Sequence, residues 1–289
     1  MVEVSVIIPT CNRPEFLKKA IESVYNQSLL PKEIIVVDDS SITDNLSIIK
    51  AFNNEKIKCH YFKFNKSMGA CAARNKGAEL AKGDILMFLD DDDTWERDKI
   101  KSQMRIFETN PNVGLVYSGR LIVSDKNRNK ILRKIPPKAS GYIYPQLFYE
   151  NLIGTTSSVA IKKDIFVKAG GFDVSFPALQ DYDLWIRICK LTKVAHDNSY
   201  SVRYTVFDNN KQISGQVNRQ LKAIQLFLEK YAEEIDKLGF IGRRKVIAQR
   251  YFSLAKSVHR HSYLNALKWT IKGFLTFPKP KFIFLTIPY

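Results

Sequence analysis

In the N-terminal third of the chain, short apolar runs rich in Val and Ile alternate with amphipathic stretches. Runs of this length are typical of strands buried on both faces of a parallel sheet, and the stretches between them carry apolar residues at helical spacing. This order, with short connections, predicts an α/β fold with a Rossmann-like, doubly wound and mostly parallel sheet. The predicted strands are Val2–Pro9, Glu33–Val37, Ile57–Phe64 and Ile85–Leu89, and the predicted helices are Arg13–Gln27, Thr43–Phe52 and Gly69–Ala81.

The rest of the chain continues this pattern less regularly and ends in helices. After about Gly215 the pattern is wholly helical, over Gln216–Lys237 and Arg243–Leu275, which predicts a C-terminal helical extension. Before it, we expect strands at Val113–Val123 and Ser157–Ile161, a charged loop at Asp125–Lys134, and helices at Gly141–Asn151, Asp164–Ala169 and Gln180–Thr192.

Polar clusters follow three of the predicted strands directly. They are Thr10–Arg13, Asp38–Asp39 and Asp90–Asp93. Ligands of doubly wound sheets bind outside the carboxyl ends of the strands, so we expect these clusters to converge on one site.

The run Asp90–Asp93 is the most informative cluster, because adjacent carboxylates repel one another and no Lys or Arg adjoins them in the sequence. Oxygen ligands suit Mg²⁺ or Mn²⁺, which share their coordination shells with phosphates. The alternative is a solvated acidic turn that caps the next helix. The position of the run, after a buried strand and before Thr94-Trp95, favours metal binding.

Three further motifs each leave two interpretations open. Asp38–Ser41 is either a turn that caps the next helix or a carboxylate that accepts hydrogen bonds from a base or ribose. Arg74, among the small residues of Gly69–Gly77, is either a surface residue or a donor to a phosphate or base. Asp181 and Asp183 are either acids favoured by a helix dipole or the source of a general base.

Composition limits the class of protein and its compartment. A chain of 289 residues with 45% hydrophobic and 26% charged residues can bury a large core. Its four cysteines lie far apart without a CxxC pair, which argues against a disulfide framework or a zinc site and favours a reducing compartment. We see no signal peptide and no apolar run long enough to span a membrane, so we expect a cytoplasmic protein.

The net charge of +16 is unevenly placed, since residues 237–289 hold eleven Lys and Arg and no acid. Apolar and aromatic residues lie among these cations. Such a helix can lie on an anionic membrane, at roughly 1 kcal/mol per cation near the surface, which would place the protein peripherally on the inner face of the cell membrane. We therefore predict an anionic membrane surface as a partner of residues 243–289; the alternative is a helical cap with a solvated basic face.

Six motifs in order resemble the family 2 glycosyltransferases with the GT-A fold: VSVIIPTCNR, IIVVDDSS, GACAARNKG, FLDDDDTW, GGFD and LQDYDLWIRI. The resemblance implies a catalytic domain over residues 1–215, with a nucleotide-sugar half at about 1–95 and an acceptor half at about 96–215, before a basic helical region at 216–289. It implies an inverting transfer from a nucleotide-sugar, a UDP-sugar by family habit. The acceptor would be a hydroxyl of a glycan or lipid-linked glycan in bacterial surface polysaccharide synthesis, such as that of a capsule.

The resemblance also implies a role for each matching residue. Asp92 would hold the metal, Mn²⁺ or Mg²⁺, and Asp181 would be the base that deprotonates the acceptor. Asp39 would accept from the uracil, and Arg74 would contact the base or phosphate. The other nucleotide-binding residues would be Pro9, Thr10, Asn12, Arg13, Asp90 and Asp91, and the sugar and acceptor side would include Gly171, Phe172, Asp173 and Trp185. Many members carry a His in the loop after the last core strand, where this chain has Tyr204–Ser214.

Two other functions fit parts of the sequence. A nucleotidyltransferase acting on sugar phosphates also pairs acidic metal ligands with an α/β fold, but such enzymes usually open with a Gly-rich phosphate loop, and Thr10–Arg13 has no Gly. A basic nucleic-acid-binding protein would explain the net charge. The chain shows no helix-turn-helix, RNP-like or zinc pattern, and the strand-end carboxylates would repel phosphates, so we predict no nucleic acid partner. The oligomeric state stays open, a homo-oligomer included.

Overall fold

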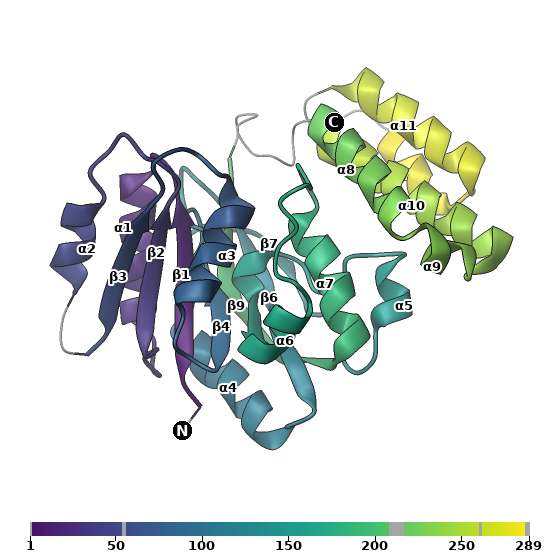
Figure 1. Cartoon of the computed structure of the whole chain (residues 1–289). Helices are drawn as coiled ribbons and strands as arrows, with labels where there is room; N and C mark the ends of the chain where they lie inside the picture. The colour runs from purple at the N-terminus through teal and green to yellow at the C-terminus, as the bar shows by residue number, and fades with distance from the viewer. Residues whose placement is uncertain (1, 54–55, 208–216, 260–261, 287–289) are drawn as a thin grey trace. The chain divides into compact units, whose positions relative to one another are not determined.

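The structure is a computed structural model that describes residues 2–53, 56–207, 217–259 and 262–286 (Figure 1). Its contacts divide the chain into two compact units. The first unit comprises Met1–Tyr144, Leu152–Val174 and Leu184–Val206. The second comprises Pro145–Asn151, Ser175–Asp183 and Phe207–Tyr289, so two short segments from the middle of the sequence belong with the C-terminal region.

A single mixed sheet forms the centre of the first unit in the part of the chain that the structure describes (Figure 1). Its strands follow the order β3-β2-β1-β4-β8-β6-β9-β5, and β7 pairs with β6. The pairs β1–β2, β1–β4, β2–β3 and β6–β9 are parallel. The strands are β1 (Val4–Thr10), β2 (Glu33–Asp38), β3 (Lys58–Lys63), β4 (Ile85–Phe88), β5 (Thr94–Trp95), β6 (Val113–Ser124), β7 (Ile131–Ile135), β8 (Val159–Lys162) and β9 (Lys193–Val206).

Helices cover both faces of this sheet because each presents an apolar stripe to it. In α1 (Pro14–Tyr25), a proline at the first position suits the helix start, and Leu17, Ala20, Ile21 and Val24 are buried. In α3 (Ala70–Leu80), a Cβ added at Gly77 would lie 2.4 Å from Ile7 Cγ2, so glycine allows close packing on β1. The others are α2 (Leu46–Phe52), α4 (Lys99–Thr109), the 3₁₀ turn η1 (Thr156–Ser158), α6 (Lys163–Lys168) and α7 (Gln180–Leu191), whose first turn belongs to the second unit.

The second unit is helical, as the sequence predicts. A core of Ile224, Leu254, Ala255, Val258, Ala266 and Trp269 lies between its helices. The described residues contain no helix that is both long and apolar enough to cross a membrane. Its elements are α5 (Tyr144–Leu147), α8 (Val217–Lys230), α9 (Ala232–Asp236), α10 (Gly239–Val258), α11 (Tyr263–Thr276) and the 3₁₀ helix η3 (Pro280–Thr286).

The predicted α/β class, the mostly parallel first half of the sheet and the helical extension are confirmed, whereas several local predictions are wrong. The charged segment Asp125–Lys134 contains the start of β7, a mostly exposed strand whose pairing with β6 needs no apolar pattern. The predicted helix Gly141–Asn151 is reduced to the four residues of α5. The sequence pattern also did not predict α4 or β9. β9 lacks an apolar pattern because it carries many half-buried polar residues.

One cation of the first unit is wholly buried. The Lys99 side chain donates from Nζ to Gln103 Oε1 at 2.7 Å and to the Ser158 carbonyl at 3.1 Å, and lies 5.1 Å from the centre of the Trp95 ring. Burial lowers the pKa of Lys99 from 10.5 to about 7, because the charged form loses its hydration. The neutral amine keeps both hydrogen bonds, so the buried site tolerates it.

The depressed pKa predicts a pH-dependent stability. Between about pH 7 and pH 10 the unfolded chain binds a proton at Lys99 that the folded chain lacks, so the free energy of unfolding rises with pH by up to about 1.4 kcal/mol per unit. We expect Lys99→Met to remove this rise. Urea unfolding at several pH values, with the exposed Lys101→Met on the same helix as control, measures it. Parallel pH profiles of the native chain and Lys99→Met would contradict this prediction.

Candidate active site

The carboxylates that follow β4 are paired with two arginines from distant segments. Arg74, on α3, donates to Asp90 at 2.5 Å. Arg13, which precedes α1, donates from one nitrogen to Asp91 at 3.2 Å and to Asp92 at 2.8 Å. The acids therefore have basic neighbours in space that they lack in the sequence.

Two of the acids are buried and tie together separate parts of the sheet. Asp91 accepts from the Thr10 hydroxyl at the end of β1, at 2.8 Å. Asp93 accepts from the Ser157 hydroxyl at 2.6 Å and from the Thr205 amide at 3.0 Å, at the end of β9. The Ser157 oxygen also accepts from the Asp90 amide at 3.1 Å, so one hydroxyl bridges both ends of the run.

The cluster keeps an excess of negative charge despite the two arginines. Burial, with the Asp92 charge, raises the pKa of Asp91 to about 7 and that of Asp93 well above its usual range. Burial and the Asp90 charge also raise the pKa of Asp92. Although burial would lower the pKa of Arg13, the carboxylates of Asp91 and Asp92 outweigh this and raise it. Carboxylates with raised pKa values favour a bound cation in place of protons.

These residues fit a divalent metal only if a ligand completes its shell. Among the described residues, no group of three or more His, Cys, Asp or Glu side chains is arranged to hold a metal ion alone. Asp92 and its neighbours supply only carboxylate oxygens. Mg²⁺ and Mn²⁺ are commonly held by one or two carboxylates together with substrate phosphates, so the residue set suits a metal that arrives with a phosphate ligand.

The acids after β2 organise the neighbouring loops. Asp38 accepts from the Ser41 amide at 2.7 Å and from the Asn45 side chain at 2.7 Å. Asp38 therefore forms the turn that was one of the two interpretations of this motif. Asp39 accepts from the Met68 amide at 2.6 Å and from the Gly69 amide at 3.0 Å, and so fixes the chain that enters α3. Asn12 joins this region through its side-chain oxygen, which accepts from the Ile42 amide at 2.8 Å, and buried Pro9 lies in β1 beside β2.

The predicted sugar-side residues Gly171, Phe172 and Asp173 lie in a segment that packs beside Arg74. The Asn75 side chain accepts from the Phe172 amide and donates to the Phe172 carbonyl, both at 2.8 Å. The Phe172 ring is buried and lies 5.4 Å from the Arg74 guanidinium. Gly171 has a φ of 65°, and a Cβ there would lie 2.8 Å from Asn75 Oδ1, so glycine is required at this close approach. Asp173 follows, half-buried.

Arg128 is a site residue that the sequence did not reveal. It donates to the Asp92 carbonyl at 2.8 Å, and its guanidinium lies 4.8 Å from the centre of the Phe16 ring. Its other terminal nitrogen is buried without an acceptor among the described residues. Arg128 lies in the segment for which the sequence predicts only a charged loop. Ser157 and Thr205 likewise belong to no recognisable motif.

Two predicted residues on α7 lie apart from the cluster in the sequence. Asp181, in the second unit, is half-buried, and its carboxylate accepts from the Tyr182 amide at 2.7 Å. Trp185, in the first unit, is fully buried and donates to the Gly154 carbonyl at 3.0 Å, so any effect on an acceptor acts through the chain it supports. Residues 208–216 of the loop after β9 lie outside the described residues.

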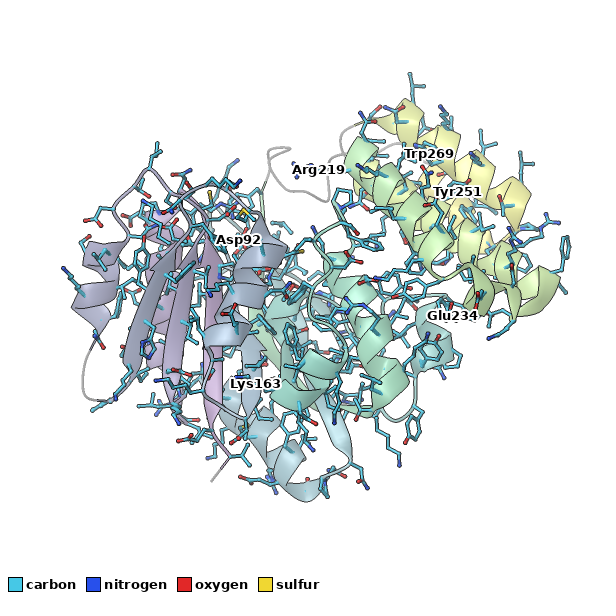
Figure 2. The ribbon with its side chains drawn as sticks, viewed as in Figure 1. Asp92, Lys163, Arg219, Glu234, Tyr251 and Trp269 are labelled. Carbon is cyan, nitrogen blue, oxygen red and sulfur yellow. The ribbon has the colours of Figure 1, made fainter. Side chains whose placement is uncertain are left out.

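The nine predicted nucleotide- and metal-binding residues thus all lie in the first unit, and six of them make contacts in the acidic cluster. The contacts join Thr10 and Arg13 with Asp91, Arg13 with Asp92, and Arg74 with Asp90. Figure 2 labels Asp92 within this unit.

Sequence relatives of the chain are glycosyltransferases. UDP-Glc:alpha-D-GlcNAc-diphosphoundecaprenol beta-1,3-glucosyltransferase WfaP of Escherichia coli is 32% identical over 206 residues, which are 70% of this chain and 77% of that protein. An uncharacterized glycosyltransferase of Haemophilus influenzae is 27% identical over 239 residues, which are 81% of this chain and 78% of that protein.

Solved structures agree at the level of the fold. Mannosyltransferase PcManGT from Pyrobaculum calidifontis, in complex with GDP-Man and Mn²⁺, has a TM-score of 0.61 and 17% identity, covering 99% of this chain and 83% of its own. S. aureus TarS 1–349 with UDP-GlcNAc has a TM-score of 0.59 and 14% identity, covering 96% and 89%. The family model described as "Glycosyl transferase family 2" matches residues 5–170. The match covers more than half of the chain, which therefore belongs to glycosyl transferase family 2 and is a glycosyltransferase of the GT-A fold.

Proposed function

We propose that the chain transfers a sugar from a nucleotide-sugar, a UDP-sugar in the first instance, to an acceptor hydroxyl with inversion at C1. The observation that carries this proposal is the meeting of Asp90–Asp93 with Arg13 and Arg74 where β1 and β4 end. An acidic cluster with excess negative charge suits a metal-bound diphosphate, and arginines beside it suit the phosphates themselves.

Each residue then has a chemical task. Asp92, with Asp90 beside it, would hold Mn²⁺ or Mg²⁺, which supplies several kcal/mol of charge stabilisation for the departing nucleoside diphosphate. Arg13 and Arg74 add positive charge near that diphosphate. Asp181 takes the proton of the acceptor hydroxyl while the acceptor oxygen bonds to C1 and the bond from C1 to the diphosphate breaks. General base catalysis of this kind accelerates a reaction by about 10²–10⁴. A single base on the face opposite the leaving group gives inversion without a covalent intermediate.

The remaining predicted residues would bind the rest of the donor and the acceptor. Asp39 would accept from the nucleotide base through Oδ1, which accepts from the Met68 amide and has a second lone pair. Asp91, Thr10, Asn12 and Pro9 would line the nucleotide pocket. Gly171, Phe172 and Asp173 would shape the sugar and acceptor side, with Trp185 behind them.

We assign the acceptor to the glycans or lipid-linked glycans of bacterial surface polysaccharides, such as a capsule. This assignment draws on relatives: the 32%-identical Escherichia coli protein is named for a diphosphoundecaprenol-linked acceptor, and another, AmsB of Erwinia amylovora, for amylovoran biosynthesis. The chemistry of the cluster also fits a nucleotidyltransferase, but membership in a glycosyltransferase family disfavours that class.

The second unit carries a surface suited to an anionic membrane. On α11, Leu264, Ile271 and Leu275 follow one another at helical spacing on one face and are 77%, 50% and 72% exposed. The exposed cations Lys268 and Lys272 lie among them. Apolar side chains flanked by cations, in a region without acids, match an anionic lipid surface, so we propose a peripheral location at the inner face of the cell membrane.

The donor site predicts metal-dependent nucleotide binding. At a hundredfold excess over the dissociation constant, UDP with Mn²⁺ should stabilise the folded chain by about 2.7 kcal/mol, and Asp92→Ala should lose this gain. Thermal unfolding with UDP, dTDP, GDP and ATP, each with and without Mn²⁺, measures it, and Asp164→Ala, an exposed acid of the same unit, is the control. A shift with dTDP or GDP alone would change the donor; no shift with any nucleotide would refute the site.

The bridging hydroxyl predicts that Ser157→Ala weakens the site. This change leaves the Asp90 amide without its acceptor and removes a donor from the Asp93 carboxylate, at a cost of about 1–3 kcal/mol of folding free energy. The stabilisation by UDP and Mn²⁺ should fall at the same nucleotide concentration. Ser201→Ala, at a buried position on β9 where the hydroxyl has no partner among the described residues, serves as control. Nucleotide binding as tight as that of the native chain would show that the bridge does not organise the carboxylates.

The membrane surface predicts salt-sensitive binding to anionic vesicles. The native chain should sediment at low salt with vesicles of phosphatidylglycerol and phosphatidylcholine, and not with phosphatidylcholine alone. Replacing Leu264, Ile271 and Leu275 together by Ser should weaken this binding at least tenfold, because burial of each side chain contributes about 1.5 kcal/mol. The control replaces three exposed apolar residues of the first unit by Ser: Ile42, Val167 and Val174. Equal loss in both variants would contradict the assignment.

A further inference from the structure

The residue that leads into α7 has an unfavourable backbone conformation. Leu179 has a φ of 62°, in the left-handed region that a side chain with a Cβ rarely adopts. Its carbonyl accepts from the Asp183 amide at 2.9 Å, and its side chain packs against the core of α8, α10 and α11. Such conformations persist where the surrounding packing holds them, and they concentrate at functional sites.

An aromatic cluster of the second unit holds Tyr182, the residue that directly follows Asp181. The Tyr182 ring stacks on Phe227 of α8, with centroids 5.5 Å apart and planes 11° apart. Arg250 of α10 donates to the Tyr182 hydroxyl at 2.9 Å, and this hydroxyl donates in turn to the Leu147 carbonyl. The Arg250 guanidinium also lies 4.6 Å from the Tyr182 ring centre and 4.9 Å from that of Phe227. Tyr182 is thereby fixed at both its ring and its hydroxyl.

Asp183 is held by a third set of contacts, from the last residue of α8 and from Tyr231, which follows it. It is fully buried, and its carboxylate accepts from the Tyr231 hydroxyl at 2.8 Å and from Lys230 at 2.8 Å. A buried carboxylate is costly unless it is paired in this way. Anchors therefore stand before and after Asp181, which itself stays half-buried.

We infer that the C-terminal helices are part of the catalytic machinery, because they position the carboxylate of Asp181, with Tyr231 and Arg250 as positioning residues. This inference rests on the proposed role of Asp181 as the base. A general base must be held within hydrogen-bond reach of the proton it takes, so the rate is sensitive to small displacements of the turn that carries it. The C-terminal region then has a task in catalysis besides contact with a surface.

The test uses full-length variants that remove one anchor each. Tyr231→Phe keeps the ring and removes the hydroxyl that Asp183 accepts from; Arg250→Met removes the guanidinium, and Arg250→Lys restores a cation. Tyr251→Phe is the control, because Tyr251 lies in the same unit but stacks on Trp269 of α11 (Figure 2). Asp181→Asn is measured beside them as the reference for loss of the base.

Two readouts are compared. UDP or GDP release from UDP-glucose, UDP-N-acetylglucosamine and GDP-mannose with Mn²⁺, with and without a lipid extract of bacterial membranes as acceptor, gives kcat and KM. Amide hydrogen exchange reports the opening of the first turn of α7. We expect Tyr231→Phe and Arg250→Met to lower kcat at least tenfold at an unchanged donor KM, with faster exchange at residues 180–184 and unchanged exchange in β1 and β4. Arg250→Lys should recover part of kcat, and Tyr251→Phe should behave as the native chain.

Each other result counts against the inference. Full kcat in Tyr231→Phe and Arg250→Met, or an equal fall in donor affinity and exchange protection across both units, would show that these residues have no positioning role. If Asp181→Asn keeps full activity, the base assignment in the proposed function fails and the positioning role fails with it. If Asp181→Asn loses activity while the anchor variants keep it, the proposed function stands and only the inference is refuted.

Discussion

The balance between four consecutive carboxylates and the arginines that reach them is the constraint on which the first unit depends. Unpaired carboxylates at this density would repel one another strongly at a low local dielectric. Arg13 and Arg74 remove part of this repulsion, and because they come from before α1 and from α3, they also fix where those helices begin or pass. Burial, together with the negative charge that is left, raises the pKa of Asp91 and Asp93. A cation with a phosphate ligand would relieve it further.

The acidic turn Asp90–Asp93 joins strands that are far apart in the sequence. Through Asp91 and Asp93 it contacts the ends of β1 and β9, and through Ser157 the turn before β8. That turn is supported from beneath by Trp95, which donates to the Ser157 carbonyl, and by buried Lys99, which donates to the Ser158 carbonyl. Buried Lys99 therefore reaches this turn through the Ser158 carbonyl and the Trp95 ring, so its burial helps to determine the shape of the turn.

The sequence predicted those parts of this arrangement that depend on local pattern. Apolar runs predict β1, β2 and β4 because both faces of these strands are buried. The acids that directly follow such a run therefore lie at the carboxyl end of its strand. The partners of these acids could not be predicted in this way. The pairing of Arg13 with Asp92, the bridge through Ser157 and the contact of Arg128 with the Asp92 carbonyl each join segments whose separation in the sequence carries no periodic signal. The first turn of α7 belongs to the second unit through contacts that are just as distant in the sequence, such as that of Asp183 with Tyr231, 48 positions later.

The absence of acids after residue 237 determines how the second unit accommodates its cations. Buried Arg250 lies against the rings of Tyr182 and Phe227, Lys272 lies 4.9 Å from the Tyr251 ring centre, and Arg244 donates to the Thr276 carbonyl at 2.6 Å. Aromatic faces and carbonyls stabilise a cation without neutralising it. The unit consequently keeps its positive charge, and ring contacts that order its interior leave that charge available to an anionic partner. Arg250, which holds Tyr182 beside Asp181, belongs to the same acid-free segment whose exposed cations favour a membrane surface, so both proposed roles of the C-terminal region draw on that segment.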